Sequence, residues 1–113
     1  MSGKWSRNKG ASYERAVAKL FKFWGWPDAK RNLDQYQAVD GRDLKGTFPF
    51  VVQCKCGKAP SPWKAYQEAR DSCTEDEIAL AVVKRDNTEA VVIMSIADFG
   101  LLVGPRKLLD KAE

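Results

Sequence analysis

The sequence predicts an α/β fold, a single domain with a mixed, mostly antiparallel central sheet flanked by helices. Segments whose apolar residues recur at helical spacing alternate along the chain with short β-branched runs, which is the pattern of helices packed on a sheet. The chain has 113 residues and 44% hydrophobic content, enough for one compact core and too short for two domains of ordinary size. We therefore expect a basic flexible arm over residues 1–10, followed by a single domain over residues 11–113.

The strongest helical pattern covers residues 11–24, where apolar side chains recur every three or four positions. Asn8 or Ser12 can cap its start, and Gly25 is suited to end it. Glu14 lies on the apolar face of this helix. We therefore expect its carboxylate to point toward the core and to need a partner, such as a cation shared with a second acid.

The middle of the chain is less regular. Residues 28–39 suit a short strand and an irregular loop, and residues 39–44 lead through a turn with Gly and Pro into a strand over residues 50–56. We expect segments 39–44 and 50–56 to form an antiparallel pair. Residues 57–62 then break the regular structure.

The second half of the chain predicts a helix, two paired strands and a short last helix. The first of these helices begins at Ser61 or Pro62 and ends near Cys73. Two β-branched runs follow, and the Asp-Asn pair between them suits a hairpin turn. Ser95 is suited to cap the last helix. The three segments are residues 78–83, 90–94 and 96–102.

One face of the strand over residues 50–56 is polar. Gln53 and Lys55 are two positions apart and share a face, whereas Cys54 falls on the opposite face, which can be ordinary core. A buried strand should carry an amide and an ammonium on one face only where that face meets something polar. Asp43 lies ten residues before Gln53. Acid, amide and ammonium together indicate a metal site.

Each of these residues also has an ordinary structural interpretation. Asp43 suits a turn, Lys55 suits an edge strand that must avoid aggregation, and Glu14 suits the first turn of a helix. Cys54 and Cys56 are disfavoured as zinc ligands because the chain has no histidine. The odd count of three cysteines indicates reduced thiols.

A net charge of +4 and a pI near 9.0 permit a polyanionic partner. Within residues 1–31, eight basic residues stand against only Glu14 and Asp28, so this end is a candidate phosphate-facing surface. No apolar run approaches the roughly 18 residues of a membrane span, and residues 1–9 lack the pattern of a secretory signal. We expect a cytoplasmic protein without a membrane partner.

At three places the sequence resembles the PD-(D/E)xK nuclease superfamily, and within it the small Holliday junction resolvases of archaea and phages. The three features are a basic, glycine-containing segment ahead of a helical Glu14, an isolated Asp43, and Gln53 followed by Lys55. The resemblance covers residues 7–67 by motif and the remainder by element order. It implies a restriction-endonuclease-like fold with an αβββαβ core.

The resemblance also implies a division of roles. Mg²⁺ or Mn²⁺ would be held by Glu14, Asp43 and Gln53, since hard cations prefer oxygen ligands. Lys55 would stabilise charge on the phosphate or orient the attacking water. Gln67 resembles a glutamine that recurs near the site in these resolvases. The implied activity is hydrolysis of phosphodiester bonds at a four-way DNA junction, in a prokaryotic cell or a phage-infected host.

A junction has near two-fold symmetry, so two cuts made by one homodimer would match it. Recognition is expected through backbone charge and DNA shape, because the sequence has no recognition-helix or finger motif. Binding should therefore weaken steeply with salt. The basic residues that flank the proposed site, and that we expect to contact phosphates, are Arg7, Lys9, Arg31, Arg42, Lys45, Lys58 and Lys64.

Gln53 is the main departure from the family pattern, which usually has Glu or Asp at this position. A neutral amide weakens the expected metal affinity, so the chain is a natural variant that still cuts, an inactivated relative, or the product of an engineered Glu-to-Gln substitution. Three further functions stay open. They are an endonuclease of restriction or repair type acting on ordinary duplex, a nuclease fold that only binds DNA, and an interaction module with no nucleic-acid role.

Overall fold

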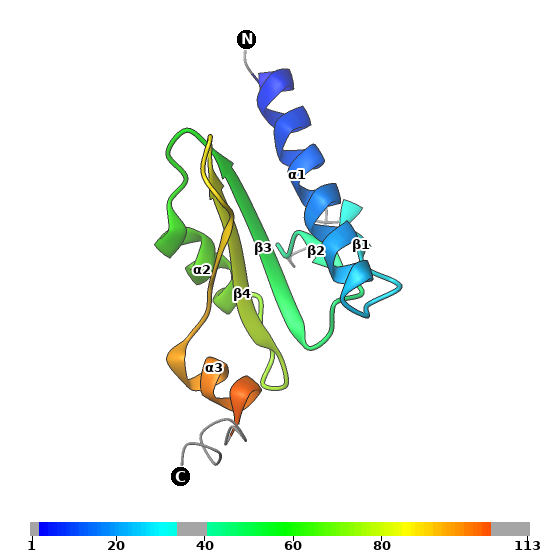
Figure 1. Cartoon of the computed structure of the whole chain (residues 1–113), viewed down its shortest axis with the longest axis vertical. Coiled ribbons are helices and arrows are strands. Elements are labelled where there is room, and N and C mark those ends of the chain that lie inside the picture. Colours follow the sequence, from blue (N-terminus) through cyan, green and yellow to red (C-terminus); the bar gives the residue numbers. More distant parts are fainter. Residues whose placement is uncertain (1–2, 34–40, 105–113) are drawn as a thin grey trace.

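The computed structural model describes residues 3–33 and 41–104, and these form one α/β domain (Figure 1). This confirms the predicted fold class, a central sheet flanked by helices. No helix in these two ranges is long and apolar enough to cross a membrane. The elements in chain order are α1 (Gly3–Phe23), β1 (Lys30–Arg31), β2 (Leu44–Lys45), β3 (Phe50–Gly57), α2 (Pro62–Asp71), β4 (Ile78–Arg85), β5 (Val91–Ile93) and α3 (Ile96–Val103).

The central sheet has three strands in the order β3-β4-β5. β3 and β4 run parallel, with Phe50 opposite Ile78 and Gly57 opposite Arg85, whereas β5 pairs antiparallel with β4. The parallel pairing follows from α2, which forms the crossover between β3 and β4. β1 and β2 form a separate antiparallel pair. The sheet is therefore mixed as predicted, although its longest pairing is the parallel one.

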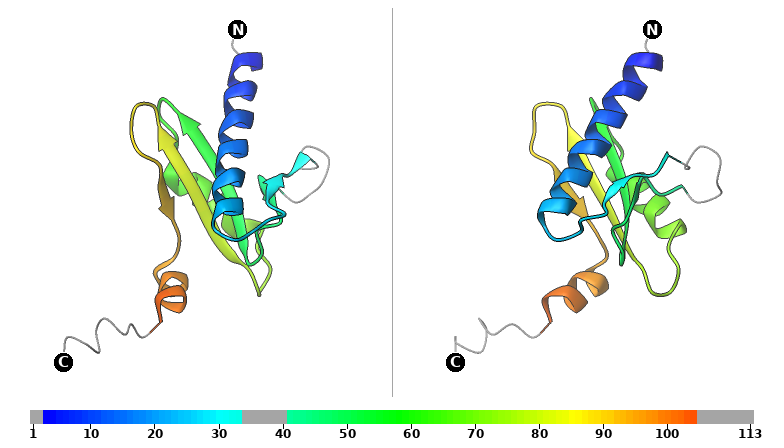
Figure 2. Two further views of the ribbon diagram at one scale, coloured as in Figure 1. Left: turned by 45° about the vertical axis from the view of Figure 1, so that its right-hand side comes forward. Right: turned by 90° about the vertical axis from the view of Figure 1, so that its right-hand side faces the viewer.

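The two faces of the sheet are covered by different helices (Figure 2). On one face α1 packs Val17 and Phe21 against Val52 and Cys54 of β3 and their neighbours on β4. On the other face a smaller cluster joins α2 to β4. Because side chains alternate along a strand, residues 52 and 54 face α1 while residues 53 and 55 face α2. β3 is therefore packed from both sides.

The prediction that the first helix begins at residue 11 is wrong, because α1 begins at Gly3. Asn8 and Ser12 consequently lie inside the helix and do not cap it. Apolar periodicity detects only the part of a helix that packs against a core, and among the α1 side chains described, from Asn8 on, the first buried residue is Glu14. The basic segment therefore forms the first turns of α1 from Gly3 onward.

The prediction that residues 39–44 pair with residues 50–56 is also wrong in its main part. β2 pairs with β1, with Lys45 opposite Lys30, and residues 34–40 lie outside the described residues. The predicted short strand after residue 28 is present as β1. The Asp-Asn turn joins β4 to β5, as predicted. Ser95 caps α3 as predicted, and Ser61, predicted together with Pro62 as a possible helix start, is the N-cap of α2; each serine accepts a hydrogen bond from a backbone N–H three residues later.

The same substitution should have opposite effects at two glycines. Gly10 lies inside α1, where an added Cβ would meet nothing within 4 Å, so Gly10→Ala should raise the free energy of unfolding by about 0.5–1 kcal/mol. Gly46 has φ +76°, and a Cβ there would collide with the backbone carbonyl of Asp28. Gly46→Ala should therefore lower the free energy of unfolding by roughly 2 kcal/mol or more. Urea denaturation followed by circular dichroism measures both. A loss of stability in Gly10→Ala would place the start of α1 after residue 10.

Candidate active site at the outer edge of β3

Asp43 occupies the edge of β3 that faces away from β4. Its backbone N–H donates to the carbonyl of Val52 at 3.0 Å, and its Oδ2 accepts from the backbone N–H of Cys54 at 2.7 Å. The side chain is only 6% exposed. Asp43 thus forms the two hydrogen bonds that an adjacent strand would otherwise make with the backbone of Val52 and Cys54. The same hydrogen bonds hold its carboxylate within the fold.

Burial raises the pKa of the Asp43 carboxyl from its usual value of 3.8 to about 7. The backbone hydrogen bond from Cys54 acts in the opposite direction, and so does the positive charge of Lys55. The negative charges of Glu14 and Glu68 raise the pKa further. Asp43 therefore lies within electrostatic reach of two acids and one cation.

Gln53 and Lys55 both meet Glu68, which projects from α2. The amide Nε2 of Gln53 donates to Oε1 of Glu68 at 3.1 Å, and the Lys55 ammonium lies 3.2 Å from the same oxygen. Burial by itself would raise the pKa of Glu68, but the Gln53 hydrogen bond and the Lys55 charge outweigh it and lower that pKa. Gln53 is 7% exposed, and its Oε1 is buried without a hydrogen-bond partner.

Glu68, which the sequence did not predict, contacts Gln53 and Lys55, and the predicted Gln67 does not take this place. Gln67 is exposed, whereas its neighbour Glu68 reaches the polar face of β3. Helical geometry contained the signal, because Ala65 and Ala69 are the small residues of α2 that pack on the sheet. Position 68 flanks that face and position 67 points away from it.

Glu14 approaches the site from α1. Its side chain is 9% exposed and shares a helix face with Val17 and Phe21, as the sequence predicted. The partner of its carboxylate is Arg31 of β1, whose Nε donates to Oε1 at 2.9 Å. The partner that the buried Glu14 carboxylate requires is therefore a guanidinium of the same chain, whereas the sequence suggested a cation shared with a second acid.

Three of the predicted phosphate-contacting residues form ion pairs with acids of the chain: Lys9, Arg31 and Arg42. Arg42 is engaged by its own chain, with one terminal nitrogen 2.9 Å from the Glu77 carboxylate and the other donating to the carbonyl of Ser72. This pairing lowers the pKa of Glu77. Lys45 is partly buried in β2, and Lys58 and Lys64 are exposed. Arg7 lies in α1, outside the residues whose side chains are described.

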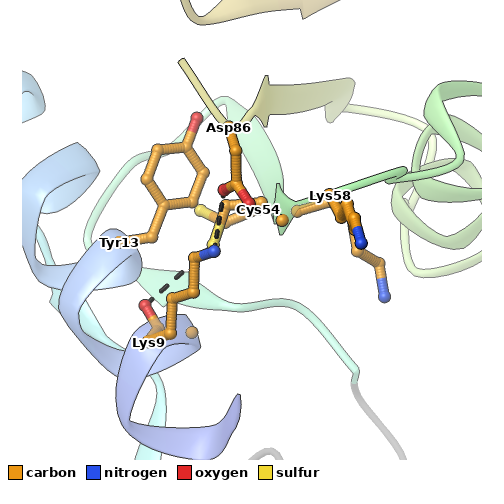
Figure 3. A pocket seen from close by; sticks show the side chains of 9 residues that line it. Lys9, Tyr13, Cys54, Lys58 and Asp86 are labelled. Atoms are coloured by element: carbon orange, nitrogen blue, oxygen red, sulfur yellow. Dashed lines mark hydrogen bonds and ion pairs between the residues drawn. The ribbon is translucent and has the colours of Figure 1, made fainter. Parts of the chain in front are cut away.

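A cavity of about 460 Å³ adjoins the site, since Cys54 and Lys55 contribute to its wall. In Figure 3, Lys9 from α1 meets Asp86 from the turn after β4, with Tyr13 beside them, and the ion pair measures 2.7 Å. Burial raises the pKa values of the Tyr13 hydroxyl and the Cys54 thiol, so both groups stay protonated near neutral pH. The charged groups on the wall are therefore three lysines and Asp86.

The acids of the site approach it from three elements without forming a ready-made metal cage. Within residues 3–33 and 41–104, no group of three or more His, Cys, Asp or Glu side chains is placed to hold a metal ion. Glu14 and Glu68 each have a cationic partner, whereas Asp43 is held by a backbone amide. A cation bound here would have to draw on Asp43, on neutral oxygen atoms, and on carboxylate oxygens of Glu14 and Glu68 other than the Oε1 atoms that pair with Arg31 and Lys55.

Comparison of the chain with protein-family models, with curated proteins and with solved structures finds no match. The candidate site therefore rests on its own geometry.

Asp43 should make the protein less stable as the pH rises. The native state keeps the Asp43 proton up to a pH of about 7, whereas the unfolded chain loses it near 3.8. Between these values the native state holds more protons, so stability falls as pH increases, by up to roughly 4 kcal/mol in total. Asp43→Asn, which cannot ionise, should lack this loss and exceed the wild type in stability at pH 8. Urea denaturation of both proteins at pH 4, 6 and 8 tests this, and parallel profiles would contradict it.

Proposed function

We propose that this chain is a metal-dependent endonuclease that hydrolyses phosphodiester bonds in DNA, with a branched four-way junction as its substrate. The observation that carries the proposal is the convergence of groups at the outer edge of β3. Asp43 is bonded to the strand itself, and Gln53 and Lys55 project from it. Acids from helices on opposite faces, Glu14 and Glu68, lie within electrostatic reach of Asp43. Four members of this set, Glu14, Asp43, Gln53 and Lys55, are residues that the resemblance to the PD-(D/E)xK nucleases implies, whereas Glu68 is not.

Mg²⁺ or Mn²⁺ would be held by Asp43, Glu14 and the carbonyl oxygen of Gln53. The fit is supported by Oε1 of Gln53, a buried oxygen that lacks a hydrogen-bond partner and that a cation would satisfy. The metal would supply Lewis-acid stabilisation of a phosphoryl oxygen when bound. Glu68 accounts for the departure at Gln53, because a carboxylate from α2 lies 3.1 Å from the amide. We propose that Glu68 provides the negative charge that an acid at position 53 would carry.

Lys55 is the cationic group of the site. Its ammonium is partly exposed, and Glu68 holds it at one edge of the site by the 3.2 Å ion pair. An ammonium fixed in this way can stabilise the negative charge that builds up on a phosphate during hydrolysis. Asp43 and Glu68 are the nearby acids that can position a water molecule by hydrogen bonding.

A nuclease fold that only binds DNA is the second candidate. The observation that favours it is the hydrogen bond from Gln53 to Glu68, which satisfies that carboxylate without a metal. An endonuclease acting on ordinary duplex, of restriction or repair type, is the third. For all three we propose the cytoplasm of a prokaryotic cell or of a phage-infected host as the location.

We also propose a homodimer, in which a second copy covers β5 and α3. None of the α3 side chains is buried, and Ile96 and Leu101 are 84% and 78% exposed. Val91 and Val92 on β5, at the end of the sheet order, are exposed as well. An apolar helix beside an edge strand can pair with its own copy about a two-fold axis, and the same symmetry suits two cuts in one junction.

Cleavage of a labelled four-way junction, compared with a linear duplex of the same sequence in Mg²⁺ or Mn²⁺, tests the function. The wild type should cut the junction preferentially, and Asp43→Asn, Lys55→Met and Glu68→Gln should each lower the rate about 100-fold or more while still binding DNA. Glu75→Gln, a matched change at an exposed acid, should leave the rate unchanged. Gln53→Glu should raise the affinity for the metal.

The other outcomes separate the candidates. Binding of the junction without cleavage by the wild type supports the silent nuclease fold, and equal cleavage of both substrates supports the duplex endonuclease. If the wild type neither binds nor cuts either DNA, the proposed function is wrong.

The dimer has a separate test. Replacing Ile96 and Leu101 together by serine removes exposed apolar area without touching the core, so a dimeric wild type should become monomeric. Light scattering after size-exclusion chromatography measures the mass. Trp63→Ser, at another exposed apolar residue, on α2, is the control and should remain dimeric. A monomeric wild type would contradict the proposal.

A further inference from the structure

A groove between α1 and β1 is lined by side chains of a single charge sign. Five of its eight lining residues are basic, and the others are two alanines and a leucine. Its volume is about 600 Å³. The two elements lie side by side in both views of Figure 2. The lining residues are Arg15, Ala18, Lys19, Lys22, Ala29, Lys30, Arg31 and Leu33.

The α1 side of the groove carries a row of cations at regular spacing. Arg15, Lys19 and Lys22 follow one another at four and three positions, so they share one helix face, and all three are exposed. At about 1.5 Å of rise per residue the row is roughly 10 Å long. Successive phosphates of one DNA strand rise by about 3.4 Å each along the duplex axis and lie farther apart along the strand itself, so a row of this length can contact about two successive phosphates.

β1 supplies the opposite side of the groove. Lys30 is exposed, and the groove floor is formed by buried alanines, so small side chains leave room between the two rows of charge. Cations placed this close together repel one another, and a polyanion lying between them would relieve that repulsion. A concave groove of this kind fits the phosphodiester backbone of a nucleic-acid strand better than it fits a flat anionic membrane.

Arg31 connects the groove to the candidate site. It lines the groove, and its Nε donates to Glu14, the acid that approaches Asp43 from α1. A guanidinium has five N–H donors in a fixed fork, so Arg31 can keep its bond to Glu14 and donate to a phosphate with its terminal nitrogens. A strand held in the groove would therefore be aligned with the outer edge of β3.

We propose that the α1–β1 groove binds the phosphodiester backbone of one duplex arm of DNA and leads it to the candidate site. This inference rests on the proposed function for the identity of the polyanion. The sequence marks the basic residues of 1–31 as a candidate phosphate-facing surface, and the structure gathers five of them in this one groove. Because the contacts are to phosphates, the groove gives affinity and orientation and does not read base sequence.

The test replaces the row of cations on α1. The triple variant Arg15→Gln, Lys19→Gln, Lys22→Gln keeps good helix formers at exposed positions, and thermal denaturation checks that it folds. The control variant Arg70→Gln, Lys84→Gln, Arg85→Gln removes the same charge from α2 and β4. Binding of both to a labelled four-way junction and to a linear duplex is measured by fluorescence anisotropy between 50 and about 300 mM salt, without divalent metal.

The groove variant should bind both DNAs about 10- to 100-fold more weakly than the wild type, and its plot of log K against log salt should be shallower by about 2–3. The control variant should stay close to the wild type. Equal losses in the two variants would overturn the inference, because affinity would then follow net charge alone. A wild type that binds DNA combined with an unaffected groove variant would overturn it too, while leaving the proposed function intact.

Two further outcomes are decisive. A wild type that binds neither DNA would remove the proposed function, and the inference with it. A groove variant that loses binding to vesicles of phosphatidylserine but retains DNA binding would assign the groove to an anionic membrane and overturn the inference.

Discussion

The structure depends on the way in which Asp43 closes the outer edge of β3. An edge strand normally leaves a row of backbone groups to solvent or to a neighbouring strand. Here the backbone of Asp43 donates to Val52 and its carboxylate accepts from Cys54. These contacts hold the carboxylate inside the fold, where burial raises its pKa to about 7 although the hydrogen bond from Cys54 acts in the opposite direction. Asp43 therefore both pairs with the outer edge of β3 and provides a buried carboxyl with a raised pKa.

The alternation of side chains along β3 then distributes the remaining groups of the site. Cys54 joins the core under α1, while Gln53 and Lys55 face α2, so acids reach this edge from helices on both faces of the sheet. Glu14 and Glu68 are each held by a cation. The candidate site is consequently rich in acids and still nearly balanced in charge, which lowers the cost of burying the Glu14 and Asp43 carboxylates.

The charges and apolar groups outside the site divide the molecule into distinct surfaces. Five cations of α1 and β1 gather in one groove that meets the site at Arg31, whereas the apolar side chains of β5 and α3 project elsewhere. Arg42, which sequence reasoning placed on the DNA side, instead holds Glu77 at the start of β4. Positive charge in this chain thus serves both internal pairing and exposed surface, and only the contacts distinguish the two uses.

The amino-acid sequence was sufficient to predict the α/β class, the ends of α2 and α3, the strands β3 to β5, and the faces on which Glu14, Gln53 and Lys55 lie. These depend on capping residues, turns and side-chain periodicity, which are local along the chain. Tertiary structure alone decided the start of α1, the pairing of β2 with β1, and the partners of Glu14 and Asp43. It also brought in Glu68, since contacts between elements depend on register and packing, which no local pattern encodes.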